Sequence, residues 1–579
     1  MTDALAHRGP DGEAFWMNSK QTAGFGHRRL AIIDLSSAAA QPMHYAGRYT
    51  IVYNGEIYNY IEIKASLLQK GYAFHSQSDT EVILAAYDCY KQDCLQLFDG
   101  MFAFAIWDEQ QQELFAARDR LGEKPFYYFI DDGQLVFASE MKALWAAGVD
   151  RQVNEEMLYN YLTLGYTLNP AHPQQTFYTG IHKLPAGTYL LYRPHQLTIY
   201  QYRQIHTAPI ARSDQEAVEQ FNSLFQTAIK RRLRSDVPLG TSLSGGLDSS
   251  TVLAHIQQPS CKTFSAVFPG FKNDESGAIR TVAAYMGVPN IQVQPDAESL
   301  VAGFDKLCYH QEEPFQSASI AAQFYVYQTA RMHGVPVLLD GQGADEILAG
   351  YRKYYHWYWQ QLYTSDKKAL YKELQAARKM GITEPWGWQN KLAATFPGLA
   401  AWYAKQRAGH RHIARDFQQH HGKSFYRLPL TNDLNSVLYY NTFENGLEDL
   451  LRYADRNAMA HGVEVRLPFL YYELVTFIFS LPAHFKIRKG YTKWLLRETM
   501  KNRLPHSIVW QTRKIGFEPP QQQWMQHPQL QEYVREAKQI LVQKGILKKE
   551  ILQKKIQPMD AHAAENYDWR YLVAGWLLR

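Results

Sequence analysis

The stretch Val237-Pro-Leu-Gly-Thr-Ser-Leu-Ser-Gly-Gly-Leu-Asp-Ser-Ser250 decides the fold of the larger part of the chain. Its apolar residues predict a short strand, its Ser-Gly-Gly predicts a tight turn, and an amphipathic helix is expected to open at Ser249. Free backbone N–H groups and the helix dipole at such a turn favour phosphate oxygens. The stretch therefore predicts a site for the phosphates of a nucleotide.

Asp248 lies at the mouth of this turn, where a carboxylate beside phosphate usually shares a divalent ion with it. No Lys-Ser/Thr pair follows the glycines, so the stretch is not a Walker P-loop. Ser244-Gly-Gly-Leu-Asp-Ser-Ser250 instead resembles the PP-motif of ATP pyrophosphatases, which split ATP into AMP and pyrophosphate. The structural alternative is a plain Gly-Gly turn between a strand and a helix.

Composition excludes several classes of protein. A chain of 579 residues, 46% apolar and 20% charged, is too long for one core and suggests two or three globular domains. A net charge of +5 without a dense basic run does not indicate nucleic-acid binding. No apolar run reaches the ~18 residues of a membrane span, and the start is not a signal peptide. Four cysteines form no disulfide framework, so we expect a cytoplasmic protein. We expect small molecules as its partners and leave open whether it forms a homodimer.

Strands and helices alternate after the PP-motif. Residues 263–268, 290–293 and 335–339 read as buried strands, and residues 276–286, 298–309 and 320–333 read as helices. This alternation predicts an α/β doubly wound parallel sheet with ligands at the carboxyl ends of its strands. The glycine-rich loop Asp340-Gly-Gln-Gly-Ala-Asp-Glu346 falls at such an end and suits a Mg-nucleotide, although Asp345 and Glu346 could simply begin the next helix.

The first part of the chain is expected to be an α+β sandwich. Residues 49–54, 100–107 and 113–118 predict strands, residues 55–59 a turn, and Ser78-Asp-Thr-Glu81 the start of a helix. His7-Arg-Gly-Pro-Asp, Tyr53-Asn-Gly-Glu-Ile-Tyr-Asn, Ser78-Asp-Thr-Glu and Arg118-Asp-Arg-Leu-Gly together resemble the class II glutamine amidotransferase domain. The resemblance implies an N-terminal nucleophile hydrolase-like fold.

The same resemblance assigns four glutamine-binding residues. Arg29 would grip the carboxylate of glutamine, because a guanidinium suits it bidentately, and Asp79 would hold the amino group. Asn54 and the Gly55 N–H would form the oxyanion hole. Taken singly, Asn54-Gly55 is also an ordinary turn, and Arg29 could be a surface arginine.

The nucleophile of that family has no counterpart in this sequence. The family opens with Met-Cys-Gly-Ile and a strand, whereas here no cysteine precedes Cys89. Thr2 would become N-terminal after removal of Met1, but it stands about one strand and a loop too late. We therefore expect a sandwich that lacks its first strand and a 579-residue chain that does not hydrolyse glutamine. A misplaced start codon explains the retained pocket better than a recent loss.

The order of motifs over nearly the whole chain resembles asparagine synthetase. Further matches are Glu312-Glu-Pro, Leu451-Arg-Tyr-Ala-Asp-Arg-Asn, Gly462-Val-Glu-Val-Arg, Lys493-Trp-Leu-Leu-Arg and Lys514-Ile-Gly-Phe. In that family ATP activates aspartate as β-aspartyl-AMP, which ammonia from glutamine then attacks. The resemblance implies ATP and Mg²⁺ as cofactors.

The resemblance also implies the residues of the synthetase site. Pyrophosphate and Mg²⁺ would be held by Ser244, Gly245, Gly246, Asp248 and Ser249, with Asp345 as the second metal ligand. Leu243 and Ala266 would lie beside adenine, and Asp340 and Gly341 beside the rest of the nucleotide. Lys493 would neutralise charge as pyrophosphate leaves, unless it is only an exposed helical lysine.

Two departures from the family pattern concern the acceptor. Gln342 stands where many members have an acid; its amide can orient substrate but cannot act as a base. Tyr471-Tyr472 stand where many members have Asp and a basic residue. We assign Gln342 and Lys493 as catalytic residues.

We predict a glutamine amidotransferase-like domain at residues 1–205, a linker at 206–215 and a synthetase domain with a helical C-terminal part at 216–579. The first functional reading is asparagine formation from aspartate, reduced in this form to the ammonia-dependent reaction. Two alternatives stay open. One is a relative that adenylates another carboxylate, such as a polysaccharide sugar acid or a β-lactam precursor. The other is a non-catalytic scaffold.

Overall fold

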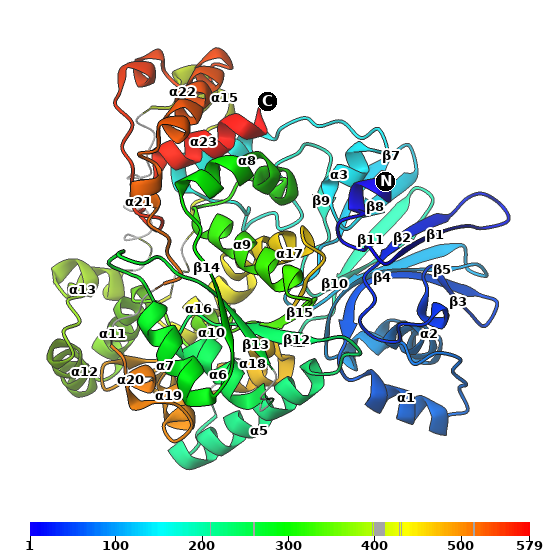
Figure 1. Cartoon of the computed structure of the whole chain (residues 1–579), viewed down its shortest axis with the longest axis horizontal. Coiled ribbons are helices and arrows are strands. Elements are labelled where there is room, and N and C mark those ends of the chain that lie inside the picture. The colour runs from blue at the N-terminus through cyan, green and yellow to red at the C-terminus, as the bar shows by residue number, and fades with distance from the viewer. Residues whose placement is uncertain are drawn as a thin grey trace.

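The computed structural model describes residues 1–205, 207–208, 210–256, 258, 261–396, 398, 412–427, 429, 431–512 and 516–579. The strands of the first 205 residues and the helix-rich remainder lie side by side as two lobes (Figure 1). Of the predicted linker, His206 and Pro209 lie outside the described residues. Helix α5 (Asp214–Arg232) begins two residues before the predicted domain boundary, because Ser213 and Glu216 form a capping box at its N-terminus.

The N-terminal lobe is built on a six-stranded antiparallel sheet of order β11-β10-β6-β5-β4-β3. Ile51 and Tyr53 of β4 pack with α1 and α2 on one face, and Val52 packs with Phe25 and Phe126 on the other. This alternation follows from the two-residue period of a strand. The α+β sandwich is thus confirmed. The strands are β1 (Gly12–Met17), β2 (Gly24–Arg29), β3 (Met43–Tyr45), β4 (Tyr49–Ile57), β5 (Gly100–Asp108), β6 (Glu113–Arg118), β7 (Tyr127–Asp131), β8 (Gln134–Ala138), β9 (His182–Lys183), β10 (Thr188–Arg193) and β11 (Gln196–Gln201).

Helices and one corrected turn complete this lobe. The helices of this part of the chain are α1 (Tyr60–Gln69), α2 (Asp79–Tyr90), α3 (Met141–Trp145) and α4 (Glu155–Leu164), of which α4 packs against helices Arg415–His421 and Tyr567–Leu577 of the second lobe. Ser78 caps α2 as predicted, by accepting a hydrogen bond from the Thr80 N–H. The predicted turn at residues 55–59 is wrong in its first half, because β4 continues to Ile57, where it pairs with Gly100 of β5. Gly55 permits this, since its φ of +139° and its approach to Met101 exclude a side chain.

The second lobe contains the predicted doubly wound sheet. Five parallel strands lie in the order β14-β13-β12-β15-β16. The strand of the PP-motif, β12, is central, and the chain proceeds to opposite sides of it, which makes its carboxyl end a switch point. The strands are β12 (Leu239–Ser242), β13 (Lys262–Ala266), β14 (Asn290–Val293), β15 (Val337–Leu339) and β16 (Glu464–Arg466).

Helices flank this sheet and form the rest of the lobe. Helix α6 (Leu247–Ile256) begins two residues before the predicted Ser249. The others are α7 (Ser276–Met286), α8 (Ala297–Gln311), α9 (Ser319–Met332), α10 (Ala344–Ile347), α11 (Lys353–Ser365), α12 (Lys367–Lys379), α13 (Trp388–Thr395), α15 (Arg415–His421), α16 (Leu434–Phe443), α17 (Leu447–Met459), α18 (Tyr472–Phe479), α19 (Trp494–Met500), α20 (His506–Val509), α21 (Gln521–Trp524), α22 (Pro528–Gln543) and α23 (Tyr567–Leu577). A short hairpin of β17 (Ile487–Arg488) and β18 (Tyr491–Thr492) precedes α19.

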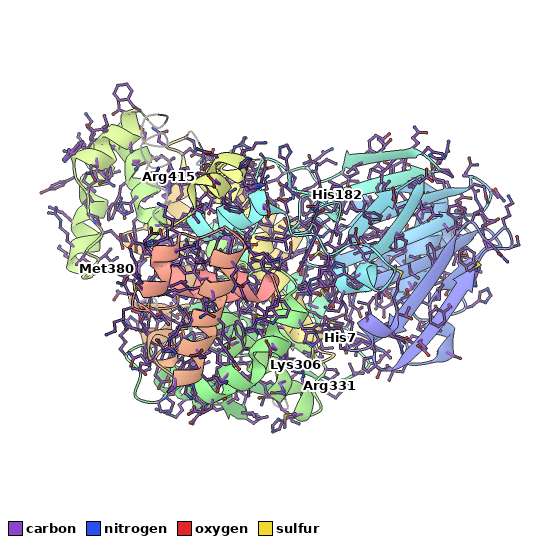
Figure 2. All side chains as sticks on the ribbon, turned by 90° about the horizontal axis from the view of Figure 1, so that it is seen from above. His7, His182, Lys306, Arg331, Met380 and Arg415 are labelled. Carbon is purple, nitrogen blue, oxygen red and sulfur yellow. The ribbon has the colours of Figure 1, made fainter. Side chains whose placement is uncertain are left out.

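Buried charges join the two lobes. Arg456 of α17 lies 2.9 Å from Glu140 of the first lobe and 2.8 Å from Glu312 of the second. Burial by itself would raise the pKa of Glu140, but Lys142, Arg456 and Arg8 hold it well below its ordinary value. His7, whose Nε2 donates to Glu140 Oε2 at 3.0 Å, lies between the strands of one lobe and the helices of the other (Figure 2).

Candidate functional site

A cavity of about 480 Å³ opens at the carboxyl ends of β12 and β15. Its lining contains almost every residue predicted for the synthetase site, from four separate segments of the chain: Leu243, Ser244, Gly246, Asp248, Ser249, Ala266, Asp340, Gly341, Gln342, Asp345 and Lys493. The turn itself is internally ordered, since the Ser244 N–H donates to Ser249 Oγ at 3.2 Å. The fold thus brings the predicted groups to one sheet edge, while the role of each remains a prediction.

Lys493 connects the two carboxylate-bearing loops. Its Nζ lies 2.5 Å from Asp248 Oδ2 and 2.5 Å from Asp345 Oδ1. Burial by itself would lower the pKa of Lys493, but the two carboxylates raise it above its ordinary value. Lys493 is buried, so the alternative of an exposed helical lysine is wrong. The ammonium is a positive charge held where the phosphates of a nucleotide would meet the PP-motif turn.

The same pair of carboxylates fits a divalent cation. A cation already stands between them in the form of the Lys493 ammonium, and carboxylate oxygens are the ligands that Mg²⁺ prefers. Within the described part of the chain, no group of three or more His, Cys, Asp or Glu residues could hold a metal ion. Asp248 and Asp345 would therefore hold Mg²⁺ together with nucleotide phosphates, as is usual for this ion.

Two glycines shape this site in ways that the sequence did not reveal. Gly245 does not line the cavity; a Cβ there would lie 2.7 Å from Ile279 N, so the residue is needed for the close approach of α7. Gly350 does line the cavity, and a Cβ there would lie 1.7 Å from Asp345 Oδ1 and 2.2 Å from Lys493 Cε. The absence of a side chain at Gly350 makes room for the lysine–carboxylate contact.

The third loop supplies two further polar groups. Burial raises the pKa of Asp340, whose Oδ2 accepts a hydrogen bond from Tyr327 Oη at 2.8 Å. Gln342 Nε2 donates to the Leu450 carbonyl at 3.3 Å, and its Oε1 is buried without a partner among the described residues. Gln342 thus presents a fixed amide to the cavity.

Tyr471 and Tyr472, the second departure from the family pattern, do not line the cavity. Tyr471 Oη accepts a hydrogen bond from Arg231 at 3.3 Å, and the Arg120 guanidinium of the first lobe lies 4.3 Å from the Tyr472 ring centroid. Tyr472 thus contacts the first lobe directly, whereas Tyr471 is linked to it through Arg231, which also donates to Asp99 of the first lobe at 3.0 Å. Of the Lys514-Ile-Gly-Phe517 motif, Lys514 and Ile515 lie outside the described residues, whereas Phe517 lines the cavity.

The sequence reasoning gave no role to Glu346 and Tyr351, which also line the cavity. Tyr351 Oη donates to Glu346 Oε1 at 2.5 Å. The acidic pair Asp345-Glu346 could have indicated Glu346 as a site residue, but only Asp345 was predicted as a metal ligand.

A second cavity, of about 830 Å³, lies in the N-terminal lobe. All four predicted glutamine-binding residues, Arg29, Asn54, Gly55 and Asp79, line it. The Arg29 guanidinium is held at the wall by the carbonyl oxygens of Asp34 and Ser36, the latter at 2.8 Å.

Asp79 is buried at the wall of this second cavity. Its Oδ2 accepts hydrogen bonds from Tyr53 Oη at 2.8 Å and from the Ile57 N–H at 2.9 Å. Burial raises the pKa of Asp79 to about 6 despite these donors. A bound cation such as an ammonium would therefore stabilise the ionised form of this carboxyl group.

The second cavity contains no thiol. All four cysteines belong to the described residues, and none lines it. Thr2 does lie in its wall, close to Gly26. The structure thus brings the four predicted glutamine-binding residues to one cavity, and no cysteine lies in its wall.

Comparison with known proteins follows the same division. The asparagine synthase family model matches residues 220–578, and the glutamine amidotransferase domain model matches residues 1–203. The chain is 30% identical to Asparagine synthetase [glutamine-hydrolyzing] 1 of Bacillus subtilis, over 99% of this chain and 92% of that protein. It is 27% identical to Amidase chyE of Penicillium rubens, over 94% of this chain and 87% of that protein.

The likeness to solved structures is slight. A glutamine phosphoribosylpyrophosphate amidotransferase from B. subtilis aligns with a TM-score of 0.27 and 13% identity, covering 59% of this chain and 77% of that one. Among the described residues no helix combines the length and apolarity needed to cross a membrane.

The family matches and the near full-length relative are decisive: this chain belongs to the glutamine-hydrolysing asparagine synthetase family.

Proposed function

We propose that this chain uses ATP to activate a carboxyl group and converts it into an amide, with asparagine from aspartate as the first reading. A carboxylate oxygen attacks the α-phosphorus, and the bond to pyrophosphate breaks. Ammonia then attacks the acyl carbon, AMP leaves, and the nitrogen gives up a proton. The observation that carries the proposal is the contact of Lys493 with both Asp248 and Asp345 at the PP-motif turn.

The chemistry of this contact suits the first step. A buried ammonium beside the turn neutralises charge that develops on departing pyrophosphate, and such preorganised charge is effective in a water-poor site. Mg²⁺ held by Asp248 and Asp345 would supply further charge neutralisation. A non-catalytic scaffold has no need of this arrangement, so we set that alternative aside.

The N-terminal lobe would supply the nitrogen. Arg29 and Asp79 would orient glutamine in the glutamine-side cavity. A small cavity of about 20 Å³ lies between the lobes and would form part of a route for ammonia. Its wall shares Lys124 and Met459 with the glutamine-side cavity and includes apolar residues of α17. Because no cysteine lines the glutamine-side cavity, we propose that the 579-residue chain works with ammonia. We keep the predicted division at residues 1–205, 206–215 and 216–579 as part of this proposal.

The test is AMP and pyrophosphate release by the purified 579-residue chain with ATP, Mg²⁺ and aspartate, with ammonia or glutamine supplied in parallel. Asparagine from ammonia alone is the expected result. Asparagine formation with glutamine as the nitrogen source would contradict the proposal that this chain works only with ammonia. Failure to release AMP with any carboxylate would contradict the proposed activation step.

The second candidate is the same reaction on another carboxylate. Gln342 favours it, because an amide cannot take the proton that an acid in this loop could take. The existence of a relative named an amidase, Amidase chyE, supports it as well.

A further inference from the structure

The loop that connects α8 to α9 forms part of the wall of the cavity at the PP-motif turn, here called the nucleotide cavity. The loop comprises residues 312–318. Gln316 and Ser317 of the loop line the cavity, together with Ser319, the first residue of α9. Ser319 Oγ is buried and has no hydrogen-bond partner among the described residues. The loop thus presents polar groups to a ligand, and their positions depend on what holds the loop.

A segment of the first lobe reaches this loop. Residues 139–181 follow β8 and precede β9, two strands that both pair with β7 in a small sheet of that lobe. Between these strands the chain packs into the second lobe, where α4 contacts α15 and α23. We call residues 139–181 the bridging segment. It belongs to the part of the chain that resembles a glutamine amidotransferase domain, yet it contacts the part that carries the nucleotide cavity.

The bridging segment clamps Glu312, the first residue of the loop. The Lys142 N–H donates to Glu312 Oε1 at 2.7 Å, and the Met141 N–H donates to Glu312 Oε2 at 3.0 Å. Arg456 Nη2 lies 2.8 Å from the same Oε2 and balances the charge of the carboxylate. Hydrogen bonds to an ionised acceptor are short and strong, and Glu312 is buried, so its side chain is held in one position.

The backbone of Glu312 has a conformation that needs such support. Its φ of +61° lies in the left-handed region, which a residue with a side chain rarely adopts. A residue of this kind persists only where its surroundings determine it. Tyr178 of the bridging segment also takes part, because its Oη donates to the Glu312 carbonyl at 2.9 Å. Since Glu312 sets the direction in which the chain leaves α8, the bridging segment directs the course of the loop.

The bridging segment also holds the part of the loop that reaches the cavity. Tyr161 Oη donates to the Phe315 carbonyl at 2.8 Å, and that carbonyl also accepts from Trp569 Nε1 of α23 at 3.2 Å. Gln316 Nε2 donates to the Gly165 carbonyl at 3.2 Å. Contacts from the first lobe therefore extend from the start of the loop to a residue of the cavity wall.

We propose that Glu312 and Tyr161 are positioning residues, through which the bridging segment of the first lobe fixes the wall of the nucleotide cavity for binding of ATP. This inference rests on the proposed ATP-dependent activation and deepens it. Neither residue lines the nucleotide cavity, so both act through Gln316, Ser317 and Ser319. A contact that only joined the lobes would contribute to stability and leave the affinity for the nucleotide unchanged.

Calorimetric titration of the full chain with a non-hydrolysable ATP analogue and Mg²⁺ tests the proposal. Tyr161→Phe removes only the hydroxyl that donates to the Phe315 carbonyl, and we expect the Kd of the analogue to rise about tenfold. Tyr202→Phe is the matched control, because Tyr202 Oη donates to the Arg118 carbonyl at the same 2.8 Å, within the first lobe. Both variants should unfold at a lower temperature, but only Tyr161→Phe should change the Kd. The same Kd in both variants would overturn the inference.

Two substitutions of Glu312 separate its side chain from its backbone. Glu312→Gln keeps the size but places an amide donor against the N–H groups of α3, so the Kd should rise about tenfold or more. Glu312→Gly adopts a φ of +61° without strain but lacks the clamp, and it should weaken binding as well. Full affinity in Glu312→Gly would overturn the role of the side chain. Tyr161→Phe decides the question if neither Glu312 variant folds.

Exchange of labelled pyrophosphate into ATP is measured separately, so that the two proposals can fail independently. Weaker binding of the analogue to Tyr161→Phe, without exchange by the parent chain with any carboxylate, would keep the positioning role and defeat the proposed reaction. Exchange by the parent chain, with the same affinity in parent, Tyr161→Phe and Glu312→Gln, would overturn the inference and leave the proposed function intact. No binding of the analogue to the parent chain would overturn both.

Discussion

Arg8 in the first lobe and Asp455 in the second are joined by two parallel hydrogen bonds. Arg8 Nη1 donates to Asp455 Oδ2 at 2.8 Å, and Arg8 Nη2 donates to Asp455 Oδ1 at 3.0 Å. Both side chains are buried, and Arg8 Nη1 also donates to Glu140 at 2.7 Å. The His7-Arg8 motif, which contributes to the resemblance to the glutamine amidotransferase domain, thus also joins the two lobes.

Removal of this guanidinium should weaken the whole chain. Arg8→Met leaves buried carboxylates with fewer partners, a situation that costs about 3–5 kcal/mol. We expect a lower thermal unfolding temperature and earlier cleavage by protease between the lobes. The matched control is Arg535→Met, because Arg535 pairs with Glu532 on the surface and exposed pairs contribute about 0.2–1 kcal/mol. Equal effects of the two substitutions would show that the buried pair has no special role.

Lys493 should matter for chemistry more than for folding. Lys493→Met removes the ammonium that faces departing pyrophosphate, so we expect acid-dependent pyrophosphate exchange to fall about 100-fold or more. The variant loses one positive charge beside Asp248 and Asp345, so Mg²⁺ should raise its unfolding temperature more than that of the parent chain. Lys501→Met, at an exposed lysine, serves as the control. Full exchange activity in Lys493→Met would remove this residue from the mechanism.

Gly350 provides a steric test of the same contact. A methyl group at this position would overlap Asp345 Oδ1 and Lys493 Cε, at 1.7 Å and 2.2 Å from the new carbon. Gly350→Ala should therefore displace the lysine, and exchange activity should fall at least tenfold while the circular dichroism spectrum is retained. Gly277→Ala in α7 meets no atom within 4 Å and should leave activity unchanged.

Local pattern sufficed for two elements of the second lobe. Residues 276–286 and 290–293 were predicted with the bounds that α7 and β14 have in the structure, because their apolar spacing and flanking turn residues agree. The motif residues were predicted to meet because the carboxyl ends of parallel strands share one edge. The cavity lining confirms that they do meet.

The remaining features depend on contacts between distant parts of the chain. Asn54-Gly55 predicts a turn locally, but pairing with β5 extends the strand through it. Tyr471 follows a motif of the synthetase family, yet its hydroxyl accepts from Arg231, which in turn donates to Asp99 of the first lobe. Gly350 has no local signal at all, since its requirement comes from Lys493, far along the chain. Sequence patterns specify what a segment prefers, and tertiary packing determines what it contacts.

Asp79 gives the pocket of the first lobe a dependence on pH. Its pKa is raised to about 6, so the carboxyl is mostly ionised at pH 7.5 and mostly protonated at pH 5. Only the ionised form attracts the ammonium of glutamine. Binding of glutamine to the 579-residue chain, measured by calorimetry, should therefore weaken by about tenfold for each pH unit well below 6. The buried Glu464 also lines the cavity, and its negative charge contributes to the raised pKa of Asp79.

A pair of variants on the same helix separates Asp79 from these neighbours. Asp79→Asn should bind glutamine at least tenfold more weakly at pH 7.5 and lose the change in affinity between pH 7.5 and 5, because the amide does not titrate. Asp88→Asn is the control, since Asp88 accepts hydrogen bonds from Tyr49 and Tyr72 outside the cavity and should leave the pH profile intact. A profile that survives Asp79→Asn would assign the titration to another group of the cavity, such as the buried Glu56. Asp79 would then serve to hold Tyr53 and the end of β4 in place rather than to bind the ligand.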